Sequence, residues 1–260
     1  MNPARACIKR VANHFGFEIT RIPKAADSSI VIEYEAVNPG ATYSPWNKDS
    51  LFKEVLDLIQ GFTLVDKYRC FELWKLIEQS AKLRSGSIIE IGVWRGGTGA
   101  LIAKQAKNYG ISDKVFLCDT FTGVAKTSEK DSACKGGEHA DTSCQVVKEL
   151  IFNRMHLDNV KILEGIFPDQ TGHEIEDLQF RFCHIDVDVY QSAKDIVGWI
   201  WDKMVYGGII VFDDYGFKAC DGITKYVEEQ MNCNDRLVVH NLNGHALILK
   251  LGTDGRRHTI

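Results

Sequence analysis

Residues 87–104 read SIIEIGVWRGGTGALIAK, in which a short apolar run, a group of glycines and an amphipathic stretch follow one another. The β-branched run predicts a buried strand, and the stretch that begins near Gly97 predicts the helix that follows it. Glycines at 92, 96 and 97 let the backbone approach a ligand closely, while the helix amino end offers unpaired N–H groups to a carboxylate or phosphate. This order is typical of an α/β protein with a ligand at the end of a strand.

The same alternation continues to the end of the chain. Strand-like runs begin at 114, 160, 180 and 207, and they are separated by helical patterns over 142–155, 190–204 and 222–231. Because parallel neighbours need crossover helices, we predict a mostly parallel sheet that is covered on both faces. The last two runs, RLVVHN (236–241) and HALILKL (245–251), are joined by NLNG, which predicts an antiparallel pair at the edge of the sheet.

The first part of the chain has a different pattern. Apolar residues at helical spacing predict helices over 50–59 and 66–83, and the segment 1–48 offers a possible helix over 4–15 and a strand-like run over 28–35. We therefore divide the chain into an amino-terminal extension, 1–83, that covers a pocket, and a main domain, 84–260.

Composition excludes several classes of protein. The chain has 260 residues and a formal net charge of −4, so strong binding to nucleic acid or to anionic membranes is not expected. No apolar run is long enough for a membrane span, and the first residues lack a signal-peptide core. The eight cysteines contain no Cys-x-x-Cys pair, which favours reduced thiols over disulfides or zinc. We predict a soluble, cytoplasmic protein.

The predicted carboxyl ends of the strands carry acidic residues and glycines, which are Glu90, Gly92, Asp119, Gly165, Asp186, Asp188, Asp213 and Asp214. Ligands of open α/β sheets bind at this edge. The glycine pattern departs from the dinucleotide fingerprint, and Glu90 suits a cationic ligand better than a pyrophosphate. Asp119 is placed to accept the hydroxyls of a ribose, although an aspartate in this position can also be a helix cap.

The motifs HIDVDVY (184–190) and VFDDYG (211–216) provide four of these carboxylates. On adjacent parallel strands they would repel one another and raise one another's pKa values unless a cation neutralised them. Oxygen ligands suit Mg²⁺ or Ca²⁺; the alternative is a set of unrelated caps and surface carboxylates. We expect His184 to be a packed core histidine rather than a ligand. His139 and Asp141 belong to an irregular insert and could border the pocket.

In combination, EIGVWRGGT, CDTFTG, DTSCQVVKEL, LEGIFPD and HIDVDVYQSAKDIVGWIWDKMVYGGIIVFDDYG resemble the motif series of the macrocin O-methyltransferase (TylF-like) family. The order and spacing agree from about 62 to 250. The resemblance implies a Rossmann-like class I methyltransferase fold with a seven-stranded sheet, an amino-terminal lid over 1–83, and an S-adenosylmethionine-binding catalytic domain over 84–260.

The resemblance also implies roles for individual residues. Mg²⁺ would be bound by Asp186, Asp213 and Asp214, and Asp188 would be the general base. Leu64 replaces a methionine of the family, so no role is carried over to Arg69. The implied cofactor-binding positions are Thr63, Glu90, Gly92, Trp94, Gly96, Gly97, Thr98, Asp119, Thr120, Phe121, Asp141, Ser143, Gly165, Phe167 and Asp186.

These features predict an S-adenosylmethionine- and Mg²⁺-dependent O-methyltransferase that acts on a small-molecule hydroxyl, with a sugar vicinal diol of a natural product or glycan as the first choice. A catechol and a non-sugar hydroxyl of a peptide or polyketide are alternatives. Metal-dependent phosphoryl transfer is a rival, but the glycine turn lacks the Gly-Lys-Ser/Thr of a P-loop. An inactive cofactor-binding subunit is a second rival. We expect self-association as a dimer.

Overall fold

The computed structural model describes residues 33–35, 37 and 40–252. The predicted helix over 4–15 and most of the predicted strand over 28–35 lie outside these residues. The chain divides into two compact units, Met1–Ala36 and Val37–Ile260. The second unit contains every helix and strand discussed below.

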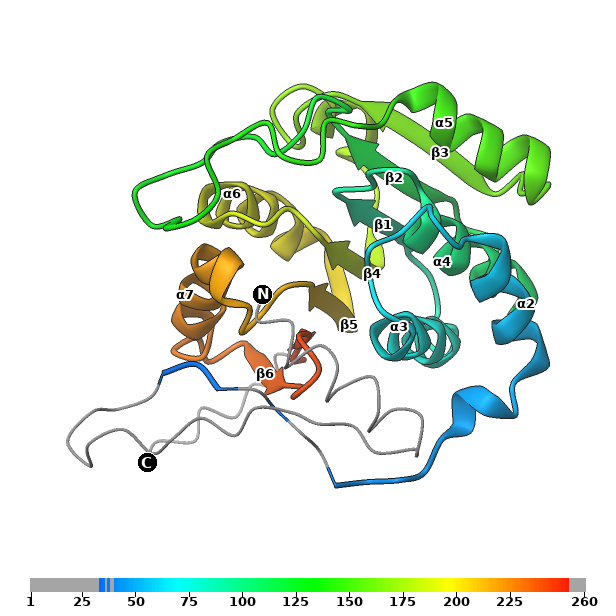
Figure 1. Cartoon of the computed structure of the whole chain (residues 1–260), viewed down its shortest axis with the longest axis horizontal. Helices are drawn as coiled ribbons and strands as arrows, with labels where there is room; N and C mark the ends of the chain where they lie inside the picture. The colour runs from blue at the N-terminus through cyan, green and yellow to red at the C-terminus, as the bar shows by residue number, and fades with distance from the viewer. Residues whose placement is uncertain (1–32, 36, 38–39, 253–260) are drawn as a thin grey trace, which may run out of the picture. The chain divides into compact units, whose positions relative to one another are not determined.

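A seven-stranded sheet forms the centre of this unit (Figure 1). Its spatial order is β3 (Val160–Glu164), β2 (Val115–Asp119), β1 (Ser87–Ile91), β4 (Phe180–Ile185), β5 (Met204–Phe212), β7 (Ala246–Lys250) and β6 (Arg236–His240). The first five strands pair in parallel, whereas β7 pairs antiparallel with both β5 and β6. The predicted fold class, a mostly parallel sheet with an antiparallel edge pair, is confirmed.

Helices cover both faces of the sheet. One face packs against α2 (Ser50–Leu58), α3 (Lys67–Ser80), α4 (Gly97–Asn108) and α5 (Cys144–Lys148), and the other packs against α6 (Tyr190–Ile200) and α7 (Asp221–Gln230). Figure 1 shows α3 and α4 on one side of the strands and α6 and α7 on the other. Short helical turns complete the set: η1 (Pro45–Asn47), the π-helix η2 (Glu149–Arg154), η3 (Gly172–Ile175), η4 (Trp201–Lys203) and η5 (Lys218–Cys220).

Aspartates cap α2 and α3, and one of them, Asp49, also joins the two helices. The Asp66 side chain accepts hydrogen bonds from the N–H groups of Tyr68 and Arg69, which caps α3. Asp49 caps α2 in the same way and also accepts a hydrogen bond from the indole N–H of Trp74 on α3, at 3.0 Å. The two helices therefore share a core with the sheet, and the division at residue 83 stays a prediction.

Three predicted helices differ from the structure, one of them the pattern over 190–204, in which α6 ends at Ile200 and the turn η4 follows. The pattern over 142–155 divides into α5 and the π-helix η2, and the pattern over 66–83 ends as a helix at Ser80. The seven cysteines among the described residues are free, in agreement with the predicted reduced thiols. In the described part of the chain, no helix has the length and apolar character required to cross a bilayer.

Gly92 follows β1 with φ +87°, and a Cβ atom there would lie 1.6 Å from the carbonyl oxygen of Asp186. We expect Gly92→Ala to lower the free energy of unfolding by about 3 kcal/mol or more, because backbone strain and a backbone clash add together. Urea unfolding followed by circular dichroism measures this change.

Gly110→Ala is the matched control. Gly110 has φ +67° but nothing within 4 Å of the added Cβ, so only the left-handed penalty of about 1–2 kcal/mol applies. Equal losses in the two variants would contradict the close approach of β1 and β4 at Gly92.

Candidate active site

A cavity of about 300 Å³ lies at the carboxyl ends of the parallel strands. The strand order reverses at this position. From β1 the chain continues to β2 and β3 on one side of the sheet, and then returns to β4 on the other side of β1. Ligands of doubly wound sheets bind at this position. The polar wall of the cavity is made by the carboxylates that follow β2, β4 and β5, which are Asp119, Asp186, Asp188, Asp213 and Asp214.

Most of the predicted site residues line this cavity. The nine cofactor positions that do so are Thr63, Gly92, Trp94, Thr98, Asp119, Thr120, Gly165, Phe167 and Asp186. His139 also lines it, as the sequence suggested. Six predicted cofactor positions do not appear in the lining: Glu90, Gly96, Gly97, Phe121, Asp141 and Ser143.

Asp119, the last residue of β2, ties down the turn after β1. One carboxylate oxygen accepts the N–H groups of Val93 and Trp94 at 2.7 and 2.8 Å, and the other accepts the N–H of Phe121 at 2.7 Å. These bonds fix the turn against the cavity. They leave part of the acceptor capacity of Asp119 facing the cavity, since a carboxylate has about four lone-pair sites.

Glu90 and Gly97 do not line the cavity, although Gly92 between them does. The Glu90 side chain is fully buried, and its Oε1 lies 2.8 Å from Nδ1 of His184. The N–H of Gly97 donates to the carbonyl oxygen of Phe62 at 2.9 Å, which holds the segment 62–65 over the cavity. A Cβ at Gly97 would lie 2.7 Å from Phe62, so this contact requires glycine.

The three remaining positions, Phe121, Asp141 and Ser143, do not line the cavity. Asp141 accepts the indole N–H of Trp94 at 2.9 Å and pairs with the Arg95 guanidinium at 2.7 Å. Ser143 is the N-cap of α5, and Phe121 is buried. A contact of Asp141 or Ser143 with the cofactor stays a prediction.

The four aspartates after β4 and β5 lie close together, as their spacing predicted. Oxygen atoms of Asp186, Asp213 and Asp214 lie within 4.8 Å of one another. Asp188 and Asp214 both have φ +63°, so the backbone turns after β4 and again after β5. Both residues line the cavity. Asp188 also accepts a hydrogen bond from the Cys220 thiol, with Sγ 3.5 Å from Oδ1.

Burial and mutual repulsion give the aspartates of the cluster different pKa values. Burial, followed by the charges of Asp213 and Asp214, raises the pKa of Asp186 well above its usual range. Burial and then the charge of Asp213 raise the pKa of Asp214 to about 8. Burial also opposes ionisation of Asp213, but His245 and Arg69 outweigh it and lower the pKa of that carboxyl. Full ionisation of the cluster is therefore unfavourable without a positive partner, and a bound cation would provide one.

Arg69 and His245 are the residues of the site that the sequence patterns missed. Nη1 of Arg69 on α3 lies 2.7 Å from both carboxylate oxygens of Asp213 and 3.6 Å from Asp214. Nε2 of His245, just before β7, lies 2.8 Å from Oδ1 of Asp213. Arg69 could have been noticed, because it precedes Leu73 and Ile77 on the apolar face of its helix.

Comparison with known proteins identifies the family. The family model described as Macrocin-O-methyltransferase (TylF) matches residues 28–243, which is well over half of the 260 residues. The chain belongs to this family. The cavity of this TylF-family chain thus lies within the matched segment, and the resemblance seen in the motifs is confirmed.

Two relatives of the TylF-family chain are named as O-methyltransferases, and the name of the first includes a rhamnosyl sugar. One, from Streptomyces olivaceus, is 8-demethyl-8-(2,3-dimethoxy-alpha-L-rhamnosyl)-tetracenomycin-C 4'-O-methyltransferase, 27% identical over 54% of this chain and 58% of its own length. The other, Mycinamicin III 3''-O-methyltransferase from Micromonospora griseorubida, is 27% identical over 59% of this chain and 64% of its own length. The chain thus matches less than two thirds of either relative.

Solved structures support the fold of the TylF-family chain. The O-methyltransferase NovP superposes with a TM-score of 0.61 at 20% identity, over 74% of this chain and 83% of NovP. The calicheamicin methyltransferase CalS11 gives a TM-score of 0.59 at 16% identity, over 82% of this chain and 95% of CalS11. The class I methyltransferase fold is therefore shown.

Proposed function

We propose that this chain is an S-adenosylmethionine- and Mg²⁺-dependent O-methyltransferase that acts on a hydroxyl of a sugar in a natural product. One observation carries the proposal: a single cavity joins the glycine turn and Asp119 on one side to the aspartate cluster on the other. A cationic methyl donor and a hydroxyl acceptor can thus be held next to carboxylates that accept a proton.

The first half of the cavity fits the cofactor. S-adenosylmethionine, when bound, supplies a methyl group on a positively charged sulfur. Gly92 provides the close backbone approach, Asp119 accepts ribose hydroxyls, and Gly165 and Phe167 border the adenine end. An ionised Asp186 would favour the positive sulfur, and the positive sulfur would in turn favour ionisation of Asp186. Glu90 is a positioning residue, because its side chain lies behind the turn rather than in the cavity.

The second half of the cavity fits a hard divalent cation. Asp186, Asp213 and Asp214 offer oxygen atoms within 4.8 Å of one another, which is the donor type that Mg²⁺ prefers. Mg²⁺, when bound, would orient two oxygens of the acceptor and lower the pKa of its hydroxyl. Asp188 then takes the proton, because it lines the same cavity beside Asp214.

The acceptor class rests on the relatives. One relative is named for O-methylation of a rhamnosyl-tetracenomycin, and another for 3''-O-methylation of mycinamicin III. A sugar vicinal diol provides the two neighbouring oxygens that a cation can bind, and a catechol provides the same pair on an aromatic ring. Incubation with labelled cofactor, Mg²⁺ and an extract of the source organism, followed by mass spectrometry, identifies the acceptor and separates these two classes.

Binding of S-adenosylmethionine is the first test of the proposal. We expect calorimetry to show a saturable 1:1 complex, and Asp119→Ala to weaken it by about 10- to 100-fold, the loss of charge-assisted hydrogen bonds. Asp57→Ala, an exposed carboxylate on α2, is the control and should bind normally. Absence of binding heat for the unmodified protein would contradict the whole proposal.

We further propose that the protein is a cytoplasmic homodimer in which residues 1–83 cover the acceptor side of the cavity. Within these residues, Phe62, Thr63, Leu64 and Val65 already line the cavity. Light scattering after size exclusion measures the oligomeric state directly.

A further inference from the structure

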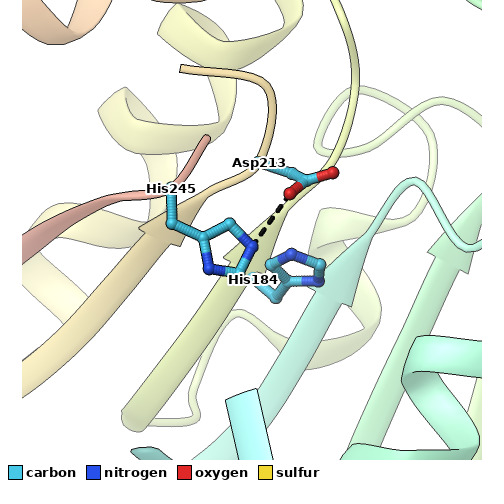
Figure 2. Close-up of side chains that lie close together, drawn as sticks. All are labelled: His184, Asp213 and His245. Carbon is cyan, nitrogen blue, oxygen red and sulfur yellow. Dashed lines mark ion pairs between the residues drawn. The ribbon is translucent and has the colours of Figure 1, made fainter. Parts of the chain in front are cut away.

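A second group of possible metal ligands lies on the sheet face that α3 covers. It consists of His184 in β4, Asp213 after β5 and His245 before β7, and one ligand atom of each lies within 4.8 Å of the others. Their exposed fractions are 0%, 3% and 0%. Figure 2 shows the two imidazole rings next to the Asp213 carboxylate, each contributed by a different part of the sheet.

Each histidine has a carboxylate partner on the other side of its ring. Nδ1 of His184 lies 2.8 Å from Glu90, and Nδ1 of His245 lies 2.8 Å from Glu72 on α3. A carboxylate at Nδ1 fixes the ring orientation and leaves Nε2 as the free coordinating atom. This carboxylate–histidine arrangement is the usual support of a metal-bound histidine.

The Nε2 atoms of both histidines are buried and have no hydrogen-bond partner among the described residues. Of the two, His245 Nε2 lies 2.8 Å from Oδ1 of Asp213, an ion-pair distance, whereas His184 Nε2 has no such neighbour. Buried polar atoms are nearly always paired, so the orphaned Nε2 of His184 beside the His245–Asp213 pair points to a partner that all three side chains could share.

We propose that His184, Asp213 and His245 form a site for a Zn²⁺-type cation. Two imidazole nitrogens and one carboxylate oxygen suit Zn²⁺ or Co²⁺, whereas Mg²⁺ prefers oxygen ligands. The predicted core position of His184 is correct, and the site adds a ligand role to it. The bound ion would connect β4, β5 and β7 at the edge of the active site.

Asp213 belongs both to this site and to the aspartate cluster. Its carboxylate has about four lone-pair sites. Arg69 Nη1 contacts both oxygens at 2.7 Å, and His245 approaches only Oδ1. The proposal does not depend on methyl transfer, because ligand type and burial alone define it. A Zn²⁺-type ion would withdraw Asp213 from the aspartate cluster, so excess Zn²⁺ should compete with Mg²⁺ there.

The experiment uses the full chain, treated with chelator, dialysed and titrated with Co²⁺ while visible absorption is recorded. We expect a saturable signal from a single equivalent, displaced by Zn²⁺. His184→Gln and His245→Gln should each weaken this binding by at least about 10-fold, and Glu72→Gln should weaken it by about 10- to 100-fold without removing a ligand.

Two controls separate this site from other cation binding. His173→Gln removes an exposed histidine of η3, and Asp186→Asn removes a carboxylate of the aspartate cluster alone; both should keep the Co²⁺ signal. Melting without metal verifies that each variant is folded, and Zn²⁺ should raise the melting temperature of the unmodified protein but not of His184→Gln. An equal Co²⁺ signal in all variants, which cysteines would give, or no signal at all, overturns the proposal.

Discussion

Asp188→Asn is expected to reduce turnover by about 10²- to 10⁴-fold, the usual contribution of a general base. S-adenosylmethionine binding should remain, because the substitution keeps the size of the side chain and removes only its ability to take the proton. Single-turnover methyl transfer with the identified acceptor measures the first quantity, and calorimetry measures the second.

The backbone at Asp188 makes this substitution clean. Asp188 has φ +63°, a left-handed conformation that asparagine tolerates better than most residues. The Cys220 thiol can still donate to the amide oxygen of an asparagine. Folding should therefore be preserved, and a change in turnover can be assigned to the lost carboxylate.

Asp57→Asn on the exposed side of α2 is the control for this prediction. Normal turnover of Asp188→Asn would show that another group accepts the proton. The Cys220 thiol also contacts this part of the cluster, but burial raises its pKa far above the usual range, which makes it a poor base. Asp186→Asn would then be the next variant to examine.

The sheet and its ligand edge could be predicted from the sequence because their signals are local. Alternating strand and helix patterns, the NLNG turn and the aspartates at strand ends each occupy a few consecutive residues. Parallel pairing of neighbouring strands then places Asp186 near Asp213, and the structure confirms this.

The partners of the aspartates could not be predicted in the same way. His245 meets Asp213 only because β7 inserts between β5 and β6, where Phe212 pairs with Ala246. Glu90 in β1 and His184 in β4 pair on the face that α3 and α4 cover. This contact depends on the register between the two strands, which neither sequence motif reveals. Residues far apart in sequence supply these contacts.

Chelation is the second prediction with a large expected effect. Removal of divalent ions with EDTA should lower the methyl-transfer rate by about 10²-fold or more, because the cation is expected to supply several kcal/mol of transition-state stabilisation. Mg²⁺ alone should restore the rate. Asp186→Asn should give a low rate that no longer responds to Mg²⁺, since it removes one of the three oxygen donors.

The contrary outcome also has a physical meaning. The Arg69 guanidinium already lies 2.7 Å from Asp213. Burial alone would lower the pKa of Arg69, but the negative charges of Asp213 and Asp66 outweigh burial and raise it. If the rate survived EDTA, Arg69 would be the group that balances the aspartates, and Arg69→Gln would then abolish turnover. If EDTA removed activity and Zn²⁺ but not Mg²⁺ restored it, the site at His184 and His245 would be the catalytic one. Rates measured with each ion, for the unmodified protein and for Asp186→Asn and His184→Gln, distinguish the three arrangements, because each variant removes a ligand that only one metal site uses.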